Sequence, residues 1–288
     1  MLNRIFLLVV CCLSVSLMAD SKKEYDLTWQ FRKGLVNIMP EKSSILSETF
    51  ILENGKETKI NSLEVNFQRT AHWTVENVIN KSQAAVLNII EGHKLEVIEN
   101  GKRFKYDPNK SWSEQDSIIQ QYKERLGSGV AFLLDIQTQK VLVTWDINKQ
   151  GDGTYKREMY RGKKDPYELG AAYKQLVNKK VAVGHTWTLQ RTTGQGFLYN
   201  YNYTFSDVVR YKKKLVAKIE VQGDILWNNL KLGTITGEML HDFKTRLMKK
   251  YKITEKVEQV SEKGGKKYIR RFVVNTEWYL SKTNSEKK

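Results

Sequence analysis

The stretch 197-FLYNYNYTF-205 decides the fold that we expect for this chain. Every second residue in it is aromatic: Phe197, Tyr199, Tyr201, Tyr203 and Phe205. Successive side chains of a β-strand point to opposite faces, so these rings would share one face of a strand. The pattern therefore predicts a strand with one unbroken aromatic face.

Two interpretations of this aromatic face follow from the residue types. In one, the rings are a core face that packs against a helix, and each ring buries about 150 to 250 Å². In the other, phenol hydroxyls at every second residue form an amphipathic lining for a lipid chain, a sugar ring or a partner loop. The candidate ligand-binding residues are then Tyr199, Tyr201, Tyr203, Trp187 and Trp29.

The same alternation runs through most of the chain and begins with apolar residues at every second position of Tyr25–Phe31. Asn54-Gly55 and Asn100-Gly101 lie between strand-like runs, and Asn-Gly adopts the positive φ angles of tight hairpins. These dipeptides predict antiparallel neighbours. Further strands are predicted at Ser47–Leu52, Lys59–Arg69, Trp73–Ile79, Ala84–Glu91, Leu95–Glu99, Val130–Ile136, Val141–Ile147, Thr186–Gln190, Leu215–Gln222 and Tyr268–Leu280.

Two short helices are expected between the strands. The first is capped by Ser113 and ends at Gly127, and the second covers Asp165–Val177. The span Met239–Tyr251 fits either a helix or a strand hairpin that turns at Lys244–Arg246. We favour the hairpin because Thr and Ile, which have high strand propensity, lie on both sides of it.

These elements predict a mainly β (α+β) protein, a large curved antiparallel sheet or half-barrel with two short covering helices. Residues 20–288 are expected to form a single β-rich domain. Thr74–Ile89 and Thr204–Ile219 can be overlaid without gaps at an offset of 130 residues. This match raises the hypothesis that the domain consists of two similar halves, 20–150 and 165–280.

The first 19 residues predict export. Arg4 precedes an apolar stretch that is too short to span a bilayer, and Ala19 is a small residue at the junction, as in a signal peptide. After cleavage near Ala19 the protein would be periplasmic or extracellular. Cys11 and Cys12, the only cysteines, would be removed. A lipoprotein anchored through Cys11 or Cys12 is the alternative, which the lack of a small residue before Cys11 disfavours.

No catalytic, metal or cofactor site is predicted. The four histidines, His72, His93, His185 and His241, lack zinc-ligand spacing. Gly127-Ser128-Gly129 does not satisfy the Gly-x-Ser-x-Gly pattern of a nucleophile turn. A hydrolase whose two carboxylates lie far apart in the sequence remains an alternative.

The chain is strongly basic, with 48 Lys and Arg residues against 32 Asp and Glu and a net charge of +16. Such a charge attracts anionic surfaces such as lipopolysaccharide, teichoic acid or phospholipid headgroups. Nucleic acid is not an expected partner, because export is predicted and no recognised binding motif occurs. Membrane association would be peripheral rather than spanning. The candidate polyanion-binding residues are Arg210, Lys212, Lys213, Lys214, Lys266 and Lys267.

Three segments carry a family resemblance: Tyr25–Phe31 with Lys33-Gly34 after it, Leu134–Val141, and Val181–Trp187. With them the chain resembles uncharacterised exported bacterial β-rich families, similar in plan to the LolA/LolB-type lipoprotein carriers. Gln139 stands where such families tend to have a glycine-centred turn. The resemblance implies a curved half-barrel whose concave side is covered by helices and holds an acyl chain. It implies no catalytic residue.

The function predicted from the sequence is therefore that of a non-enzymatic, exported envelope protein. It would bind a hydrophobic or amphipathic ligand, such as a lipid or acyl chain, in an aromatic-lined concavity. One alternative is a structural or adhesion module that binds an anionic envelope polymer through a Lys-rich rim. The second alternative is the unmarked hydrolase.

Overall fold

The computed structural model describes residues 23–122, 129–138, 140–149, 155–159, 174–176, 179–193 and 196–284. The predicted signal peptide, Cys11, Cys12 and most of the second predicted helix lie outside these ranges. Of that helix, only a 3-10 turn at Lys174–Leu176 is described.

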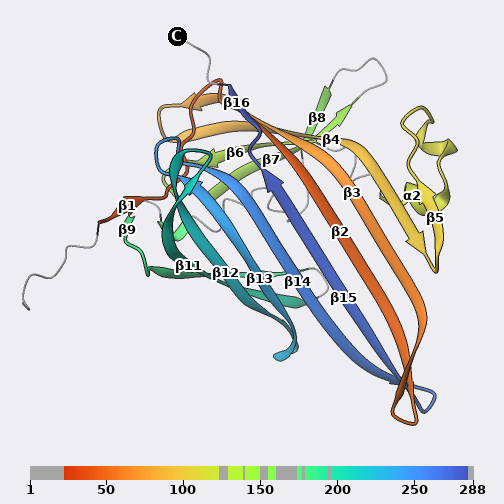
Figure 1. The fold of residues 1–288 in the computed structure, drawn as a ribbon. Helices are drawn as coiled ribbons and strands as arrows, with labels where there is room; N and C mark the ends of the chain where they lie inside the picture. Colours follow the sequence, from red (N-terminus) through yellow and green to blue (C-terminus); the bar gives the residue numbers. More distant parts are fainter. Residues whose placement is uncertain are drawn as a thin grey trace, which may run out of the picture.

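A single antiparallel sheet of fourteen strands dominates the described structure (Figure 1). Its main path runs in the order β10-β11-β12-β13-β14-β15-β2-β3-β4-β6-β7-β8, with β16 paired to β2 and β5 to β4. The strands are β2 (Val36–Glu53), β3 (Lys56–Ile79), β4 (Gln83–Glu99), β5 (Lys102–Lys105), β6 (Gly129–Asp135), β7 (Lys140–Lys149), β8 (Tyr155–Met159), β10 (Thr186–Thr192), β11 (Phe197–Tyr211), β12 (Lys214–Trp227), β13 (Leu230–Asp242), β14 (Leu247–Lys263), β15 (Lys266–Tyr279) and β16 (Lys282–Asn284). A separate pair is formed by β1 (Tyr25–Asp26) and β9 (Lys180–Val181).

The predicted fold class is confirmed, and so are the two Asn-Gly hairpins. Asn54 and Gly55 have φ angles of 51° and 75°, and they join β2 to β3. Asn100 and Gly101 likewise join β4 to β5. The predicted hairpin in 239–251 is also confirmed, because Met239 pairs with Tyr251 across β13 and β14.

The strands are longer than the sequence pattern predicted. Two predicted strands, Lys59–Arg69 and Trp73–Ile79, are parts of the 24-residue β3. The predicted break between them is wrong because Thr70, Ala71 and His72 keep pairing with β2. The overlaid segments at 74–89 and 204–219 are both hairpins, but their left-handed turns at Asn80–Lys81 and Lys212–Lys213 do not superimpose at that offset. The division into two similar halves stays a prediction.

The first predicted helix is interrupted. Ser111, not Ser113, begins a 3-10 turn at Trp112–Glu114, and α2 (Ser117–Gln120) is a separate helix of four residues. The Gln115 side chain donates to the Asp107 and Lys110 carbonyl oxygens at 2.6 and 3.2 Å, which holds the preceding loop against the turn. Gln115 and Asp116 have extended backbones there, so the helix cannot run through them.

The predicted strand at Tyr25–Phe31 is wrong beyond Asp26. Thr28 makes its hydrogen bonds outside any strand ladder: its N–H donates to Asp26 Oδ1 at 2.9 Å and its hydroxyl to the Leu176 carbonyl at 3.2 Å. The alternation nevertheless describes burial correctly, since Leu27 and Trp29 are buried in the core. This N-terminal segment crosses the end of the sheet rather than joining it.

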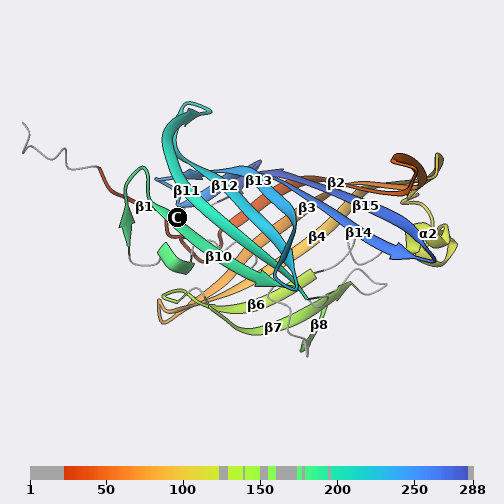
Figure 2. The same cartoon turned by 90° about the horizontal axis from the view of Figure 1, so that it is seen from below.

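The sheet curls, with β6 to β8 on one side and β11 to β13 on the other (Figure 2). Glycines allow the strands to approach closely within the curve. A Cβ atom on Gly223 would lie 2.1 Å from the Asn200 carbonyl oxygen, and one on Gly237 would lie 2.2 Å from that of Lys252. Any side chain at these positions would push neighbouring strands apart.

The two faces of the curled sheet differ in chemistry. We call the side of the sheet that carries Tyr201 the inner face. The core cluster on this side contains residues of β3 and β6 together with residues of β11 to β13. The core lies on this face, in one large cluster that includes Leu27 and Trp29 and one smaller cluster under Ile119 of α2. The outer face carries ion pairs such as Lys250–Glu238 at 2.8 Å and Lys218–Glu220 at 3.2 Å.

Candidate ligand-binding face

The aromatic residues of β11 share one face, as the alternation predicted. Trp187 of β10 stacks on Tyr203 with ring centroids 5.4 Å apart, and Tyr203 stacks on Tyr201 at 6.1 Å. Tyr201 stacks on Tyr199 at 6.2 Å. The planes in these pairs differ by only 16 to 18°, so the rings form one continuous row. We call this row the aromatic ladder.

The ladder is buried at one end and partly accessible at the other. Trp187, Tyr201 and Tyr203 are buried, whereas Tyr199 is partly buried. The Tyr201 hydroxyl donates to Glu255 Oε1 at 3.1 Å. Burial, with the Glu255 carboxylate as a lesser cause, raises the pKa of Tyr201, and burial raises that of Tyr203. Both phenols therefore stay neutral, and Tyr199 is the ladder tyrosine most available to a ligand.

Trp29 shares the large core cluster with the ladder and lies at what we call the upper end of the sheet. This end holds the turns β3–β4, β11–β12 and β13–β14. Trp29 contacts Trp73 edge to face at 6.0 Å, and the Tyr25 ring stacks on Phe243 at 4.4 Å. The N-terminal segment thus fills the inner face there. Trp29 also lines an open cleft of about 410 Å³ with Phe31, Val78, Ile136 and Arg246, and no ladder tyrosine lines that cleft.

Cross-strand register extends the ladder over the inner face. Starting from Tyr199, one row of directly paired positions continues through Ile225, Gly233, Val257, Phe272, Ser47 and Leu63. Starting from Tyr201, the next row continues through Gly223, Ile235, Glu255, Val274, Ile45 and Val65. Directly paired residues lie on the same face, so both rows belong to the inner face.

Within these rows, five apolar residues are only partly buried: Val257, Phe272, Val274, Ile45 and Leu63. We call them the inner strip. The strip connects the large core cluster, against which Val257 packs, with the small one, against which Ile45 and Leu63 pack. Phe272 and Val274 belong to neither cluster of described residues. Polar groups border the strip, with Glu255 opposite Val274 and the Arg270 guanidinium 5.9 Å from the Phe272 ring centre.

The predicted polyanion-binding residues do not come together. Arg210, Lys212, Lys213 and Lys214 lie at the β11–β12 turn of the upper end, whereas Lys266 and Lys267 begin β15 at the opposite end. All six side chains are exposed. Lys266 is paired with Glu53 at 2.9 Å.

At the upper end, lysines gather around one buried carboxylate. The ammonium groups of Lys249 and Lys214 lie 3.6 and 4.0 Å from Asp242 Oδ2. Burial of Lys249, whose side chain is only 15% exposed, lowers its pKa, and the Lys214 and Lys212 charges act in the same direction. Lys212 also lies 5.4 Å from the Tyr211 ring centre and 5.8 Å from that of Tyr279. Positive charge therefore exceeds negative charge at this point.

One titratable side chain on the inner face is completely buried. His241 lies beside this lysine cluster, and burial lowers the pKa of its imidazole to about 3, although the Asp242 and Asp26 carboxylates act in the opposite direction. Asp26 itself pairs with Arg246 at 2.9 Å, which ties the N-terminal segment to the β13–β14 turn. His241 is therefore a neutral member of the upper core.

The described ranges contain neither a metal-binding cluster nor a helix suited to span a membrane. No group of three or more His, Cys, Asp or Glu residues there is placed to hold a metal ion. None of the helices in those ranges has the length and apolar character that crossing a bilayer requires.

Comparison with known proteins gives no family: no family model and no curated protein matches the chain. Among solved structures, lipovitellin, studied for its lipid–protein interactions, is similar over 90% of this chain, with 11% identity and a TM-score of 0.46. This chain spans only 26% of the lipovitellin chain. A mutant of the monoaromatic hydrocarbon channel TodX is similar over 86% of this chain and 90% of its own length, with 6% identity and a TM-score of 0.26. Likenesses this distant carry no functional argument.

Proposed function

We propose that this protein binds a hydrophobic or amphipathic ligand, such as an acyl chain, on the inner strip and the adjoining Tyr199. The observation that supports this most is the continuity of the inner face. It is mostly apolar across seven neighbouring strands, yet the strip between its two core clusters is only partly buried. We also propose that the protein is exported and acts without catalysis.

The energetics favour an apolar occupant on this strip. Burying apolar surface contributes about 25 cal/mol for each Å², so five partly exposed apolar side chains offer a driving force to any hydrocarbon that covers them. The outer-face residues on either side of Val257, Lys256 and Glu258, are charged, although Val273 and Leu46 also face outwards. An apolar ligand would therefore be directed to the inner face.

Polar groups beside the strip would orient an amphipathic ligand. Glu255 already accepts the Tyr201 hydroxyl, and Arg270 lies near Phe272. A chain lying over Phe272 and Val274 would place its polar group near one of these two side chains. A carboxylate or phosphate headgroup would be attracted to Arg270 and repelled by Glu255.

The test compares two neighbouring residues of β15. Val274 faces inwards, opposite Ile45, and Val273 faces outwards, opposite Leu46. Both are partly buried. Binding of a fluorescent fatty acid should weaken at least fivefold in Val274→Gln and remain unchanged in Val273→Gln. Equal affinities in the two variants, at matched melting temperatures, would rule out the strip as the binding surface.

A second candidate function, adhesion to an anionic envelope polymer, is favoured by the excess of lysine charge around Asp242. Retention on lipopolysaccharide beads should then fall steeply with salt, since exposed charges are screened over about 10 Å at 0.1 M. Alanine at Lys212, Lys213 and Lys214 should reduce retention more than alanine at Lys266 and Lys267. Retention that does not respond to salt would exclude this function.

A further inference from the structure

The β12–β13 turn exposes two large apolar side chains. Trp227 is 41% exposed and Leu230 is 64% exposed, the highest value among the large apolar residues of the described ranges. Asn228 and Asn229 form the turn with φ angles of 48° and 63°, as in the tight two-residue turns of hairpins. Trp227 and Leu230 are direct cross-strand partners, so the turn holds the two side chains next to each other.

This turn adjoins the accessible end of the aromatic ladder. Phe197, the first ladder-face residue of β11, pairs directly with Trp227. Phe197, Trp227 and Leu230 therefore extend the inner face to the lower end of the sheet, which holds the turns β2–β3, β12–β13 and β14–β15. The opposite, upper end is partly filled by Tyr25 and Trp29, so among the described residues the ladder face is more accessible beside this turn, where Phe197 and Tyr199 are only partly buried.

The shape of the turn limits what can cover it. A stable protein interface buries about 800 Å² on each partner and needs complementary shape. Two side chains on a narrow turn do not offer such a surface, whereas a fluid bilayer accommodates a projecting apolar tip. Tryptophan prefers the interfacial region of a bilayer, and leucine prefers its hydrocarbon. The net charge of +16 favours a membrane that contains anionic lipids.

We propose that the β12–β13 turn is a membrane-contact site that inserts Trp227 and Leu230 into the surface of an anionic bilayer. This contact would place the accessible end of the inner face against the membrane, from which a lipid ligand would be taken up. This inference rests on the proposed function for its biological meaning, but membrane contact can be measured independently of ligand binding.

The experiment measures co-sedimentation of the purified protein with vesicles of phosphatidylglycerol and phosphatidylcholine. We expect the double variant Trp227→Ala with Leu230→Ala to lower the bound fraction at least fivefold. Leu215→Ala is the matched control, because Leu215 is 57% exposed but lies at the upper end of the sheet, after the β11–β12 turn. It should bind vesicles like the unaltered protein. Melting temperatures are compared to confirm that all variants are folded.

The outcomes separate the two proposals. If the unaltered protein does not sediment with vesicles, or if Leu215→Ala is impaired as much as the double variant, the membrane-contact site is overturned. Fatty-acid binding in vesicle-free solution is measured on the same samples. Loss of vesicle binding with intact fatty-acid binding is the expected result for the double variant. Vesicle binding without any fatty-acid binding would overturn the proposed function and leave the contact site standing.

Discussion

The upper and lower ends of the inner face differ, although one set of strands forms both. At the upper end, Leu27 and Trp29 of the N-terminal segment lie in the core with Phe205. At the lower end, Tyr199 and the inner strip are only partly buried. The same period-2 alternation therefore produces core where another segment packs on the sheet and accessible apolar surface where none of the described segments covers it.

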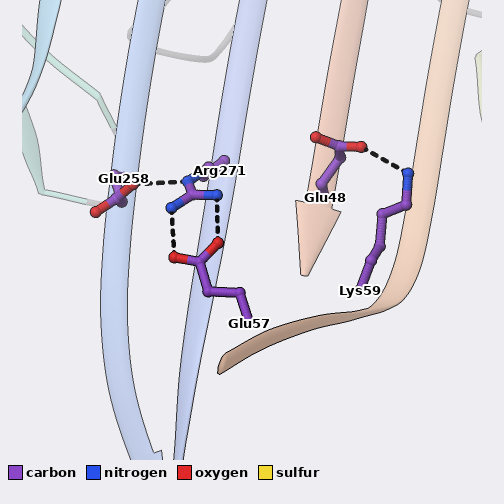
Figure 3. Close-up of polar contacts among 5 residues, drawn as sticks. All are labelled: Glu48, Glu57, Lys59, Glu258 and Arg271. Atoms are coloured by element: carbon purple, nitrogen blue, oxygen red, sulfur yellow. Dashed lines mark hydrogen bonds and ion pairs between the residues drawn. The ribbon is translucent and has the colours of Figure 1, made fainter. Parts of the chain in front are cut away.

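At the lower end, the outer face differs from the inner face because it carries ion pairs between neighbouring strands (Figure 3). Arg271 of β15 makes a bidentate pair with Glu57 of β3, with both distances 2.8 Å, and contacts Glu258 of β14 at 2.7 Å. The Arg271 hydrogen bonds lower the pKa of Glu57. Glu57 reaches Arg271 across β2, so strands β14, β15 and β3 are linked by partly exposed polar contacts rather than by a buried core.

The largest expected effect comes from removing an aromatic ring at the upper end of the inner face. Phe205 is fully buried, so Phe205→Ala should lower the free energy of unfolding by about 3 to 5 kcal/mol. Tyr199→Ala, on the same face of the same strand, should lower the free energy of unfolding clearly less, because part of the Tyr199 side chain is already exposed to water. Urea denaturation measures both. Equal losses would mean that the two ends do not differ in packing.

The shared face of the aromatic row could be predicted from sequence, because alternation in a strand depends only on local geometry. Its burial could not. Tyr201 and Tyr203 are buried while Tyr199 is partly buried, and this depends on distant segments such as Leu27–Trp29 and on register over several strands. Tyr201 and Tyr203 are therefore buried, as the core interpretation predicted, but its packing against a helix and the ligand-lining interpretation for Tyr199 stay predictions.

The inner strip could not be predicted from the sequence, for a related reason. In β2, both faces carry apolar and polar residues: Ile45, Ser47 and Thr49 point inwards, while Leu46, Glu48 and Phe50 point outwards. Phe50 is an apolar residue on the outer face, and the Arg271 guanidinium lies 4.9 Å from its ring centre. Apolar and polar residues therefore do not alternate regularly in this part of β2. Only the pairing with β15 and β3 shows which residues share the inner face.

A smaller effect should appear when pH is lowered, and it belongs to the upper end. His241 has a pKa of about 3 in the folded protein against an ordinary 6.5, because it is buried. Between these values the unfolded chain binds a proton that the folded protein does not, so stability is complete above pH 6.5 and falls below it. The loss should reach about 2 kcal/mol at pH 5. Urea denaturation at pH 7, 6 and 5 measures it.

His241→Gln is the control for this pH dependence. The charged groups facing His241 are Asp242, Asp26, Lys249 and Arg246, and none of them has an ordinary pKa between 5 and 7. In this variant the free energy of unfolding should therefore change much less between pH 7 and 5. Any loss of stability below pH 4 should remain. A slope that persists unchanged in His241→Gln would show that another group, elsewhere in the molecule, causes it.

The smallest expected effect concerns an ion pair at the lower end. Lys59 and Glu48 lie 3.0 Å apart on the outer face, with side chains 52% and 24% exposed (Figure 3). Water screens such a pair, so Lys59→Ala should change the free energy of unfolding by about 0 to 1 kcal/mol. The effect should shrink further in 1 M salt. A loss as large as that of Phe205→Ala would mean that polar contacts hold the lower end as firmly as aromatic packing holds the upper one. A small loss would mean that the lower strands are joined mainly by their backbone ladders, so that the proposed ligand would cover the inner apolar side chains without displacing a packed core.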